Sequence, residues 1–307
     1  MKNIPRESKV LSVSHNDWDG CYSQIILGNV YSDIQYLNVS FYKIDSIMES
    51  IEYHKYDFVF LTDINPTNIK LLDLSDNIIL LDHHESAIES NNPSKMHYVI
   101  PGQCAAKLTL RFVEKYYKIK LPYLYDHCEM VNDYDLWILK NPESKKLNDL
   151  MFYHYRPRKF RELFFDGRTT FNDEEKKWLE MREKEFERRY KALTVFDCDK
   201  INGCVVQSDE FINEICDKLM KEEGYEIIFC RNPVHGRVSI RHKIEGLNVG
   251  EILKNLGFGG GHRDSAGLFC ESINQFQERL EILENVIVSF INTHKMVGTS
   301  GHSVSYP

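Results

Sequence analysis

Four short clusters of acidic and imidazole side chains are the most informative feature of this sequence. They are His15-Asn16-Asp17-Trp18-Asp19-Gly20, Leu61-Thr62-Asp63, Asp82-His83-His84-Glu85 and Asn132-Asp133-Tyr134-Asp135. Carboxylate and imidazole ligands without thiolates favour ions such as Mn²⁺, Mg²⁺, Zn²⁺ or Fe²⁺. Two such ions about 3.5–4 Å apart can activate a hydroxide and hold a phosphoryl group for in-line attack. The clusters therefore predict a hydrolytic centre with two divalent metal ions.

Each cluster taken alone has a simpler interpretation. Asp-x-Asp-Gly is often a turn or a fragment of a calcium loop, and Asp-His-His can be a helix start with surface histidines. All four clusters, however, fall at the ends of expected strands or helices within one domain. That common position favours one functional site over four unrelated turns.

The first part of the chain alternates apolar strand-like segments with helix-like segments. Strands are expected at 9–14, 35–42, 56–61 and 77–81, and helices at 20–27, 45–54, 66–74, 103–118 and 121–140. This alternation predicts an α/β fold with a parallel sheet and helices on both faces. Because the carboxyl ends of parallel strands share one edge, His15, Asp63 and Asp82 would converge there. Asp135 would come from a helix that covers this edge.

The rest of the chain indicates a helical linker and a second, smaller α/β domain. The charge-rich segment 172–191 has Glu and Lys at helical spacing, which is typical of a solvated helix. Strand-like segments at 205–207, 226–230 and 237–241 and a helix-like segment at 274–291 follow. The sequence thus predicts a catalytic domain at 1–155, a linker at 156–194, a second domain at 195–293 and a disordered tail at 294–307.

Composition and charge narrow the class of protein. The 307 residues are 42% hydrophobic and 27% charged, with no apolar run of membrane-spanning length and no C-x-x-C pair among the eight cysteines. With a polar N-terminus, these features predict a cytoplasmic protein without a membrane partner, a structural zinc site or a disulfide framework. The net charge of −8 argues against a broad basic surface for long nucleic acid. Any nucleic-acid substrate would therefore be short.

The order of the four clusters resembles the DHH phosphoesterases, in which His-x-Asp-x-Asp-Gly precedes a strand-end Asp, an Asp-His-His and a final Asp. The match is close to a subgroup with His-Asn-Asp-x-Asp-Gly and Tyr-Asp-x-Trp motifs, here at 15–20 and 134–137. The resemblance implies two divalent metal ions, with Mn²⁺ preferred and Mg²⁺ the alternative. The metal ligands that it implies are His15, Asp17, Asp19, Asp63, His83 and Asp135.

The same resemblance implies a role for each of these residues. His15 and Asp17 would hold one ion, Asp19, His83 and Asp135 would hold the other, and Asp63 would bridge the two. Asp82 would orient an imidazole, and His84 would face the phosphate. The fourth cluster also contains Asp133, which stays open as the alternative to Asp135.

The C-terminal part resembles the DHH-associated domain, which presents substrate-binding residues beside a Gly-Gly-Gly-His loop. The matching segments are Arg237-Val238-Ser239-Ile240-Arg241 and Leu256-Gly257-Phe258-Gly259-Gly260-Gly261-His262. Glycines let backbone N–H groups approach an anion closely, and arginine and histidine can add charge-assisted hydrogen bonds to phosphate. The predicted substrate-binding residues are Ser239, Arg241, Gly260, Gly261 and His262. A flexible glycine-rich turn with a surface histidine is the alternative.

Together these inferences predict a metal-dependent phosphodiesterase that hydrolyses short single-stranded oligonucleotides to nucleoside monophosphates through a two-metal-activated hydroxide. The alternatives are a single-strand-specific DNA exonuclease, a phosphodiesterase for linear or cyclic dinucleotides, and an adenosine bisphosphate phosphatase. A DNA exonuclease could use the aromatic and basic segment 153–161 to stack bases and bind phosphates, although an ordinary loop between domains is the simpler interpretation. A non-catalytic nucleotide-binding regulator would lack metal ligands, and none is missing here. Monomer and homodimer both stay open.

Overall fold

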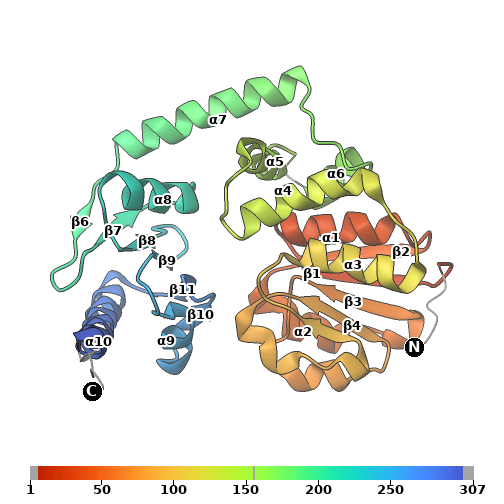
Figure 1. Ribbon diagram of the computed structural model, residues 1–307, viewed down its shortest axis with the longest axis horizontal. Coiled ribbons are helices and arrows are strands. Elements are labelled where there is room, and N and C mark those ends of the chain that lie inside the picture. Colours follow the sequence, from red (N-terminus) through yellow and green to blue (C-terminus); the bar gives the residue numbers. More distant parts are fainter. Residues whose placement is uncertain (1–5, 155, 300–307) are drawn as a thin grey trace, which may run out of the picture. The chain divides into compact units, whose positions relative to one another are not determined.

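The computed structural model describes residues 6–154 and 156–299. The chain divides into two compact units, Met1–Glu183 and Lys184–Pro307, each with its own sheet (Figure 1). The boundary between the units falls within the segment that the sequence predicts as a linker. Among the described helices, none is long and apolar enough to cross a membrane.

The first unit is built on a parallel sheet of five strands in the order β2-β1-β3-β4-β5. The strands are β1 (Val10–His15), β2 (Ile34–Val39), β3 (Phe58–Thr62), β4 (Ile78–Asp82) and β5 (His97–Val99). All four sheet pairings are parallel. The predicted α/β fold with a parallel sheet is therefore confirmed. The short β5 was not expected from the sequence.

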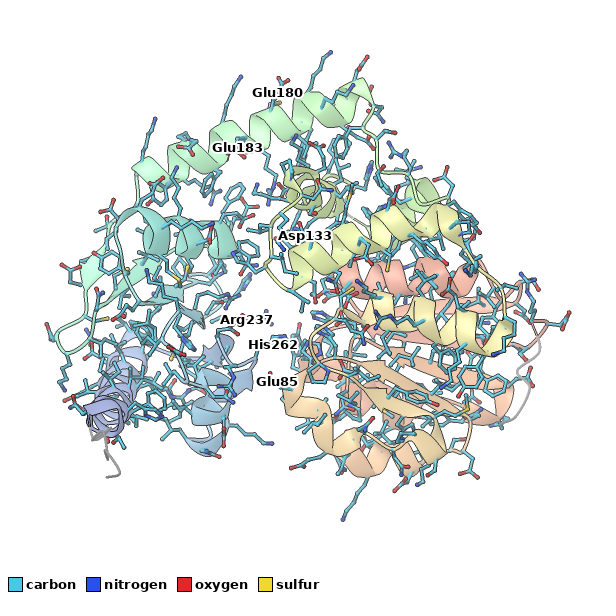
Figure 2. The ribbon with its side chains drawn as sticks, viewed as in Figure 1. Glu85, Asp133, Glu180, Glu183, Arg237 and His262 are labelled. Carbon is cyan, nitrogen blue, oxygen red and sulfur yellow. The ribbon has the colours of Figure 1, made fainter. Side chains whose placement is uncertain are left out.

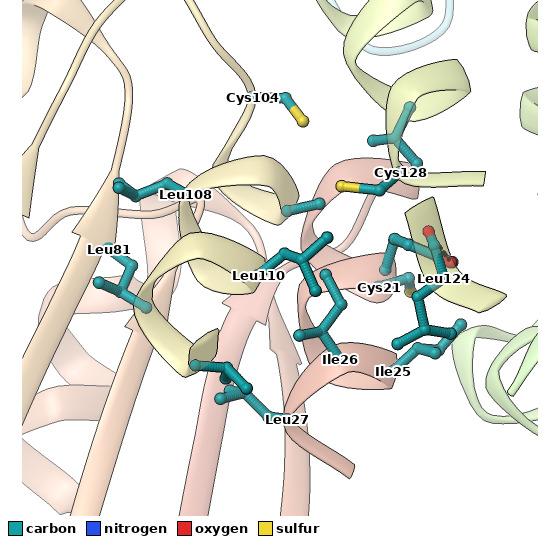
Figure 3. Close-up of a cluster of buried hydrophobic side chains, with 14 of the residues drawn as sticks. Cys21, Ile25, Ile26, Leu27, Leu81, Cys104, Leu108, Leu110, Leu124 and Cys128 are labelled. Atoms are coloured by element: carbon teal, nitrogen blue, oxygen red, sulfur yellow. Dashed lines mark hydrogen bonds between the residues drawn. The ribbon is translucent and has the colours of Figure 1, made fainter. Parts of the chain in front are cut away.

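Helices cover both faces of this sheet, as predicted. On one face, α1 (Trp18–Gly28) and α3 (Ala105–Tyr117) pack against strand residues such as Phe60 and Leu81. Figure 3 shows Leu81 beside residues of both helices. On the other face, α2 (Ile44–Ser50) packs against alternate residues such as Leu61 and Leu80. Because successive side chains of a strand point to opposite faces, two covered faces explain the continuous apolar run in β4.

Four further helices complete this part of the chain, namely α4 (Tyr125–Asp135), α5 (Pro142–Tyr153), α6 (Pro157–Phe164) and α7 (Asp173–Lys191). The sequence predicted one helix over 121–140, but α4 ends at Asp135. Trp137 and Leu139 both have φ of 53°, in the left-handed region, so a right-handed helix cannot continue through them. Short 3-10 turns lie at Phe41–Lys43, Tyr53–Lys55, Ile69–Asp73, Glu85–Ser90, Pro93–Lys95 and Pro122–Leu124.

The charge-rich helix α7 belongs to both units. Trp178 and Leu179 pack against the core of the first unit, whereas Phe186 is buried in the core of the second. The segment 153–161 precedes this helix, and some of its described residues are engaged within the fold. Phe160 is fully buried, Arg161 bonds the side chains of α1 and β2, and Tyr155 lies outside the described residues.

The second unit has a mixed sheet of six strands in the order β10-β11-β9-β8-β7-β6. The strands are β6 (Phe196–Asp197), β7 (Gly203–Gln207), β8 (Ile227–Arg231), β9 (Arg237–His242), β10 (Gly259–Gly261) and β11 (Ser265–Phe269). Only β7 and β8 pair in parallel. The helices are α8 (Ile212–Glu222), α9 (Val249–Asn255) and α10 (Ile273–Thr299). Residues 294–299, predicted as part of a disordered tail, thus continue α10, and 300–307 lie outside the described residues.

Candidate metal centre

The predicted ligands converge at the carboxyl edge of the first sheet. His15 ends β1, Asp63 follows β3, and Asp82 ends β4, while Asp135 is the last residue of α4. Possible ligand atoms within 4.8 Å of one another form three groups: Asp63, Asp82, His83 and His84; His15, Asp17 and Asp63; and Asp19, His83 and Asp135. All six residues predicted as ligands, and both predicted as catalytic, are therefore brought together.

Asp63 lies between the two groups that were predicted to hold one ion each. Its Oδ1 is 3.2 Å from Nε2 of His83, and its Oδ2 is 3.7 Å from Nδ1 of His15. The backbone of Asp63 adopts φ of 59°, and its N–H donates to the carbonyl of Leu81 at 3.0 Å. A left-handed conformation is costly for most residues and is concentrated at functional sites, although Asp tolerates it better than most. This geometry turns one carboxylate oxygen toward each group.

His15 and Asp17 are fixed by the junction of β1 and α1. Asp17 is the N-cap of α1, where its Oδ1 accepts from the N–H of Gly20 at 3.0 Å, and its Oδ2 accepts from Nδ1 of His15 at 2.6 Å. Burial alone would lower the pKa of His15, but the Asp17 carboxylate outweighs it and raises that pKa. A Cβ on Gly20 would lie 2.3 Å from the carbonyl oxygen of His15, so only glycine fits this close approach.

Asp19 is held by the start of α3. Its two carboxylate oxygens accept from the N–H groups of Ala105 and Ala106, each at 2.7 Å. These donors belong to a helix N-terminus, which favours a negative charge. Burial and the nearby carboxylate of Asp135 nevertheless raise the pKa of Asp19 to about 7. Asp19 is thus fixed in place by protein donors while its charge stays poorly compensated.

The structure separates the two aspartates of the fourth cluster. Asp133 lies toward the end of α4 (Figure 2), where its carboxylate accepts from the N–H groups of Lys140 and Asn141 and from the Ser144 hydroxyl. Burial would raise the pKa of Asp133, but these donors outweigh it and hold the pKa below its usual range. Asp135 instead places Oδ2 3.5 Å from Nε2 of His83. The geometry therefore favours Asp135 as a ligand and gives Asp133 a role in ending the helix.

The donor set fits divalent cations. Within the part of the chain that the structure describes, the buried atoms Oδ2 of Asp63, Oδ2 of Asp82 and Oδ2 of Asp135 accept no hydrogen bond. Burial and neighbouring carboxylates raise the pKa of Asp63 well above its ordinary value and that of Asp135 to about 7. Buried carboxylate oxygens without a partner are costly, and a metal ion is one way to compensate them. Oxygen and imidazole donors without thiolates match Mn²⁺ or Mg²⁺.

Asp82 orients the second histidine of its cluster. Its Oδ1 accepts from Nδ1 of His84 at 2.6 Å and from the backbone N–H of His83 at 2.8 Å. Burial would lower the pKa of His84, but the carboxylate of Asp82 outweighs it and raises that pKa to about 9. His84 is therefore a fixed imidazolium beside the acidic cluster, where it could donate to an anion.

Two residues near this edge were not expected from the sequence. Phe41 follows β2, with its ring centroid 4.5 Å from that of His15 and 5.3 Å from that of His84. The sequence predicted a strand over 35–42, which includes Phe41, and therefore gave no sign that Phe41 lies beside the site. In the structure β2 ends at Val39. His127 of α4 is fully buried, and its Nε2 accepts from the indole N–H of Trp18 at 3.1 Å. No local pattern marks such a contact across 109 residues.

The predicted substrate-binding residues of the second unit lie on neighbouring strands. Ser239 and Arg241 are in β9, and Nε and Nη2 of Arg241 both donate to Oδ1 of Asn213, at 3.1 and 2.7 Å. Gly260 and Gly261 form part of β10, and the N–H of His262 donates to Ser265 at 2.8 Å.

The glycine segment therefore differs from the predicted loop, because it pairs with β11 as a strand. Gly261 has φ of 147°, and a Cβ there would lie 2.6 Å from the carbonyl oxygen of Ser265. This close backbone packing, as well as any contact with an anion, requires glycine at position 261.

Parts of the chain are similar in sequence to known proteins. Residues 207–289 match the DHHA1 domain. A 3',5'-cyclic-nucleotide phosphodiesterase of Helicobacter pylori is 28% identical over 153 residues, which cover 42% of this chain and 44% of that protein. The chain thus spans less than half of that relative.

Two solved structures have a fold similar to that of this chain. RecJ of Thermus thermophilus in complex with Mn²⁺ has a TM-score of 0.57 at 13% identity, with 91% of this chain and 52% of that chain covered. The pGpG-specific phosphodiesterase PggH of Vibrio cholerae has a TM-score of 0.53 at 15% identity, with 93% and 99% covered. The DHHA1 match in the second unit and the Asp-His-His cluster in the first together support the resemblance to the DHH phosphoesterases that the sequence predicts.

Proposed function

We propose that this chain is a divalent-metal-dependent phosphodiesterase that hydrolyses short oligonucleotides or dinucleotides to nucleoside monophosphates. The observation that carries the proposal is the position of Asp63, with one carboxylate oxygen facing His15 and the other facing His83. A carboxylate shared in this way can hold two cations and offset their mutual repulsion. The relatives named above include phosphodiesterases, which supports the same class of reaction.

The two groups of ligands would each hold one cation. His15 and Asp17 would bind the first, Asp19, His83 and Asp135 would bind the second, and Asp63 would contact both. Two bound cations would lower the pKa of a water molecule and offset charge on the phosphate. The protein fixes the ligands beforehand, through the α1 N-cap for Asp17 and the α3 N-terminus for Asp19.

His84 would bind the scissile phosphate directly. Its Nδ1 proton is held by Asp82, so Nε2 is the ring atom that can donate to a phosphate oxygen. A raised pKa keeps this imidazole charged at neutral pH. Asp82 is therefore a positioning residue, and His84 is the residue that would touch the substrate.

The second unit would supply substrate-binding residues of its own. Arg241 is oriented by Asn213 and lies on the same strand as Ser239, so both could contact a phosphate that is not cleaved. Gly260, Gly261 and His262 are on the adjoining hairpin and would add backbone and imidazole donors.

The acidic composition favours a short substrate. A net charge of −8 disfavours a broad basic surface for additional phosphates, so affinity should stop rising after a few nucleotides. The alternatives are processive digestion of single-stranded DNA, hydrolysis of cyclic dinucleotides, and dephosphorylation of adenosine bisphosphate. Each gives different products from a panel of labelled RNA, DNA and dinucleotides of graded length.

The test uses the full chain with Mn²⁺ and this substrate panel. The Asp63→Asn variant should bind less Mn²⁺ and hydrolyse the preferred substrate about 10³-fold more slowly, because one buried charge shared by both ions is lost. The Asp33→Asn variant, at an exposed position, is the matched control and should behave as the unaltered chain. Unchanged turnover by Asp63→Asn, or full activity in the presence of a chelator, would refute the two-metal proposal.

A further inference from the structure

An exposed aromatic ring lies against the candidate metal centre. Phe41 is 43% exposed, and its ring contacts the imidazoles of both His15 and His84. Single exposed aromatic residues are common and need no explanation. Phe41 differs because one of the imidazoles that it contacts belongs to a proposed ligand, and the other to the residue proposed to bind the phosphate.

The turn that carries Phe41 is held firmly in place. The N–H of Lys43 donates to Ser40 at 2.9 Å, and Ile44, the first residue of α2, is fully buried. The carboxylate of Asp45 then accepts from the N–H groups of Thr67 and Asn68, at 2.8 and 3.1 Å. The Phe41 ring is therefore presented from a braced turn, as a preorganised binding surface requires.

The end of β2 is tied to the end of β1 by a separate contact. The side-chain amide of Asn38 donates to the carbonyl of His15 at 3.1 Å, and its oxygen accepts from Arg161 at 2.8 Å. These bonds fix the strand that leads into Phe41 relative to the strand that leads into the ligands. The spacing between the ring and the metal centre is thus set by the sheet itself.

We propose that Phe41 binds the nucleobase of the nucleotide whose phosphate is held at the metal centre, and so makes the site selective for nucleotides over simple phosphoesters. This inference rests on the proposed function and specifies its substrate. An apolar ring cannot bind phosphate, but it can stack on a base, and every base offers a π-face. Phe41 would therefore contribute affinity without strong preference among the four bases.

The first test measures binding, which does not depend on turnover. Titration calorimetry with Mn²⁺ present would compare adenosine 5'-monophosphate with ribose 5-phosphate, which lacks only the base. The unaltered chain should bind the nucleotide about tenfold to a hundredfold more tightly, the range expected for one stacked base. The Phe41→Leu variant keeps an apolar side chain but loses the ring face, so most of this preference should disappear.

The second test measures hydrolysis of a dinucleotide and of its analogue that lacks the base beside the scissile phosphate. Phe41→Leu should lower kcat/KM for the dinucleotide about tenfold or more. The kcat/KM for the analogue without the base and the amount of bound Mn²⁺ should stay as in the unaltered chain. Phe165→Leu is the matched control, because Phe165 is 41% exposed and its carbonyl accepts from the side chain of Asn29, at the far end of α1 from Asp17.

Several results would overturn the inference. One is an unaltered chain that binds ribose 5-phosphate as tightly as the nucleotide, and another is a Phe41→Leu variant that keeps the full preference. A variant that loses both substrates equally, together with Mn²⁺, would give Phe41 a merely structural role. If the unaltered chain hydrolyses neither substrate, the proposed function fails, and the binding titration still decides whether Phe41 recognises a base.

Discussion

Replacing His127 with glutamine should make the stability of the first unit less sensitive to acid. His127 is fully buried and stacks on Tyr22, with ring centroids 4.2 Å apart. Its Nε2 accepts from Trp18 at 3.1 Å, and its Nδ1 donates to the carbonyl of Arg168 at 2.8 Å. Both contacts require the neutral imidazole with the proton on Nδ1, because Trp18 is only a donor and a carbonyl is only an acceptor.

The size of the effect follows from the pKa of this histidine. The pKa of His127 is lowered to about 3, mainly by burial and to a smaller extent by the charge of Arg168. The hydrogen bond to the Arg168 carbonyl and the charge of Asp166 raise the pKa but do not outweigh burial. The unfolded chain binds a proton at His127 below about pH 6.5, but the folded chain does not until about pH 3. Stability should therefore fall as the pH falls through this window. At pH 5 the loss due to His127 is about 2 kcal/mol.

The assay is urea unfolding at pH 7.5 and pH 5.0, in chelator so that metal binding does not contribute. Glutamine offers an acceptor oxygen and a donor nitrogen and does not titrate, so the His127→Gln variant should lose about 2 kcal/mol less than the unaltered chain over this range. His54→Gln, at an exposed position, is the control and should show the pH dependence of the unaltered chain. If His127→Gln and the unaltered chain lose the same stability, the reasoning about His127 is wrong.

Three further sets of substitutions test other contacts. Asp135→Asn should reduce Mn²⁺ binding measured by metal analysis. Asp133→Asn should retain metal but lower the free energy of unfolding by about 1–3 kcal/mol, because the three groups that donate to Asp133 lose a charged acceptor. Asn213→Ala removes the acceptor that orients the guanidinium of Arg241, so it should raise KM about tenfold in steady-state assays without changing bound metal. Glu175→Gln removes the buried charge that accepts from both Nη atoms of Arg168, which should cost about 1–3 kcal/mol in urea unfolding.

The convergence of the candidate ligands could be predicted from the sequence because these residues directly follow apolar strands. His15, Asp63 and Asp82 each stand at or just after the end of a strand, and a parallel sheet places all such ends at one edge. The alternation of strands and helices was sufficient for this inference, since an error of one or two residues in a boundary does not move a strand end to the other edge. The fold of the first unit followed from the same pattern.

The contacts that distinguish neighbouring residues could not be predicted in this way. Asp133 and Asp135 are both acidic and both lie in α4. What distinguishes Asp133 is that its carboxylate accepts from the backbone N–H groups of Lys140 and Asn141, in the turn that follows the helix. Phe41 was assigned to a strand because its aromatic side chain suits one, whereas the chain turns away after Val39. Each of these outcomes depends on residues that the local pattern does not include.

The carboxylate oxygens of the candidate centre differ in whether they accept a hydrogen bond from the protein. Both oxygens of Asp19 accept backbone N–H groups, as does Oδ1 of Asp82, which fixes these carboxylates within the fold before any ion is bound. The Oδ2 atoms of Asp63, Asp82 and Asp135 are buried without a hydrogen bond from the described residues. A protein gains nothing in stability from such an oxygen, since its desolvation is not offset by a donor. The unbonded Oδ2 atoms of Asp63 and Asp135, two of the proposed ligands, therefore keep their bonding capacity for cations. The bonded oxygens of Asp19 hold the geometry of a third proposed ligand, and each keeps a second lone pair.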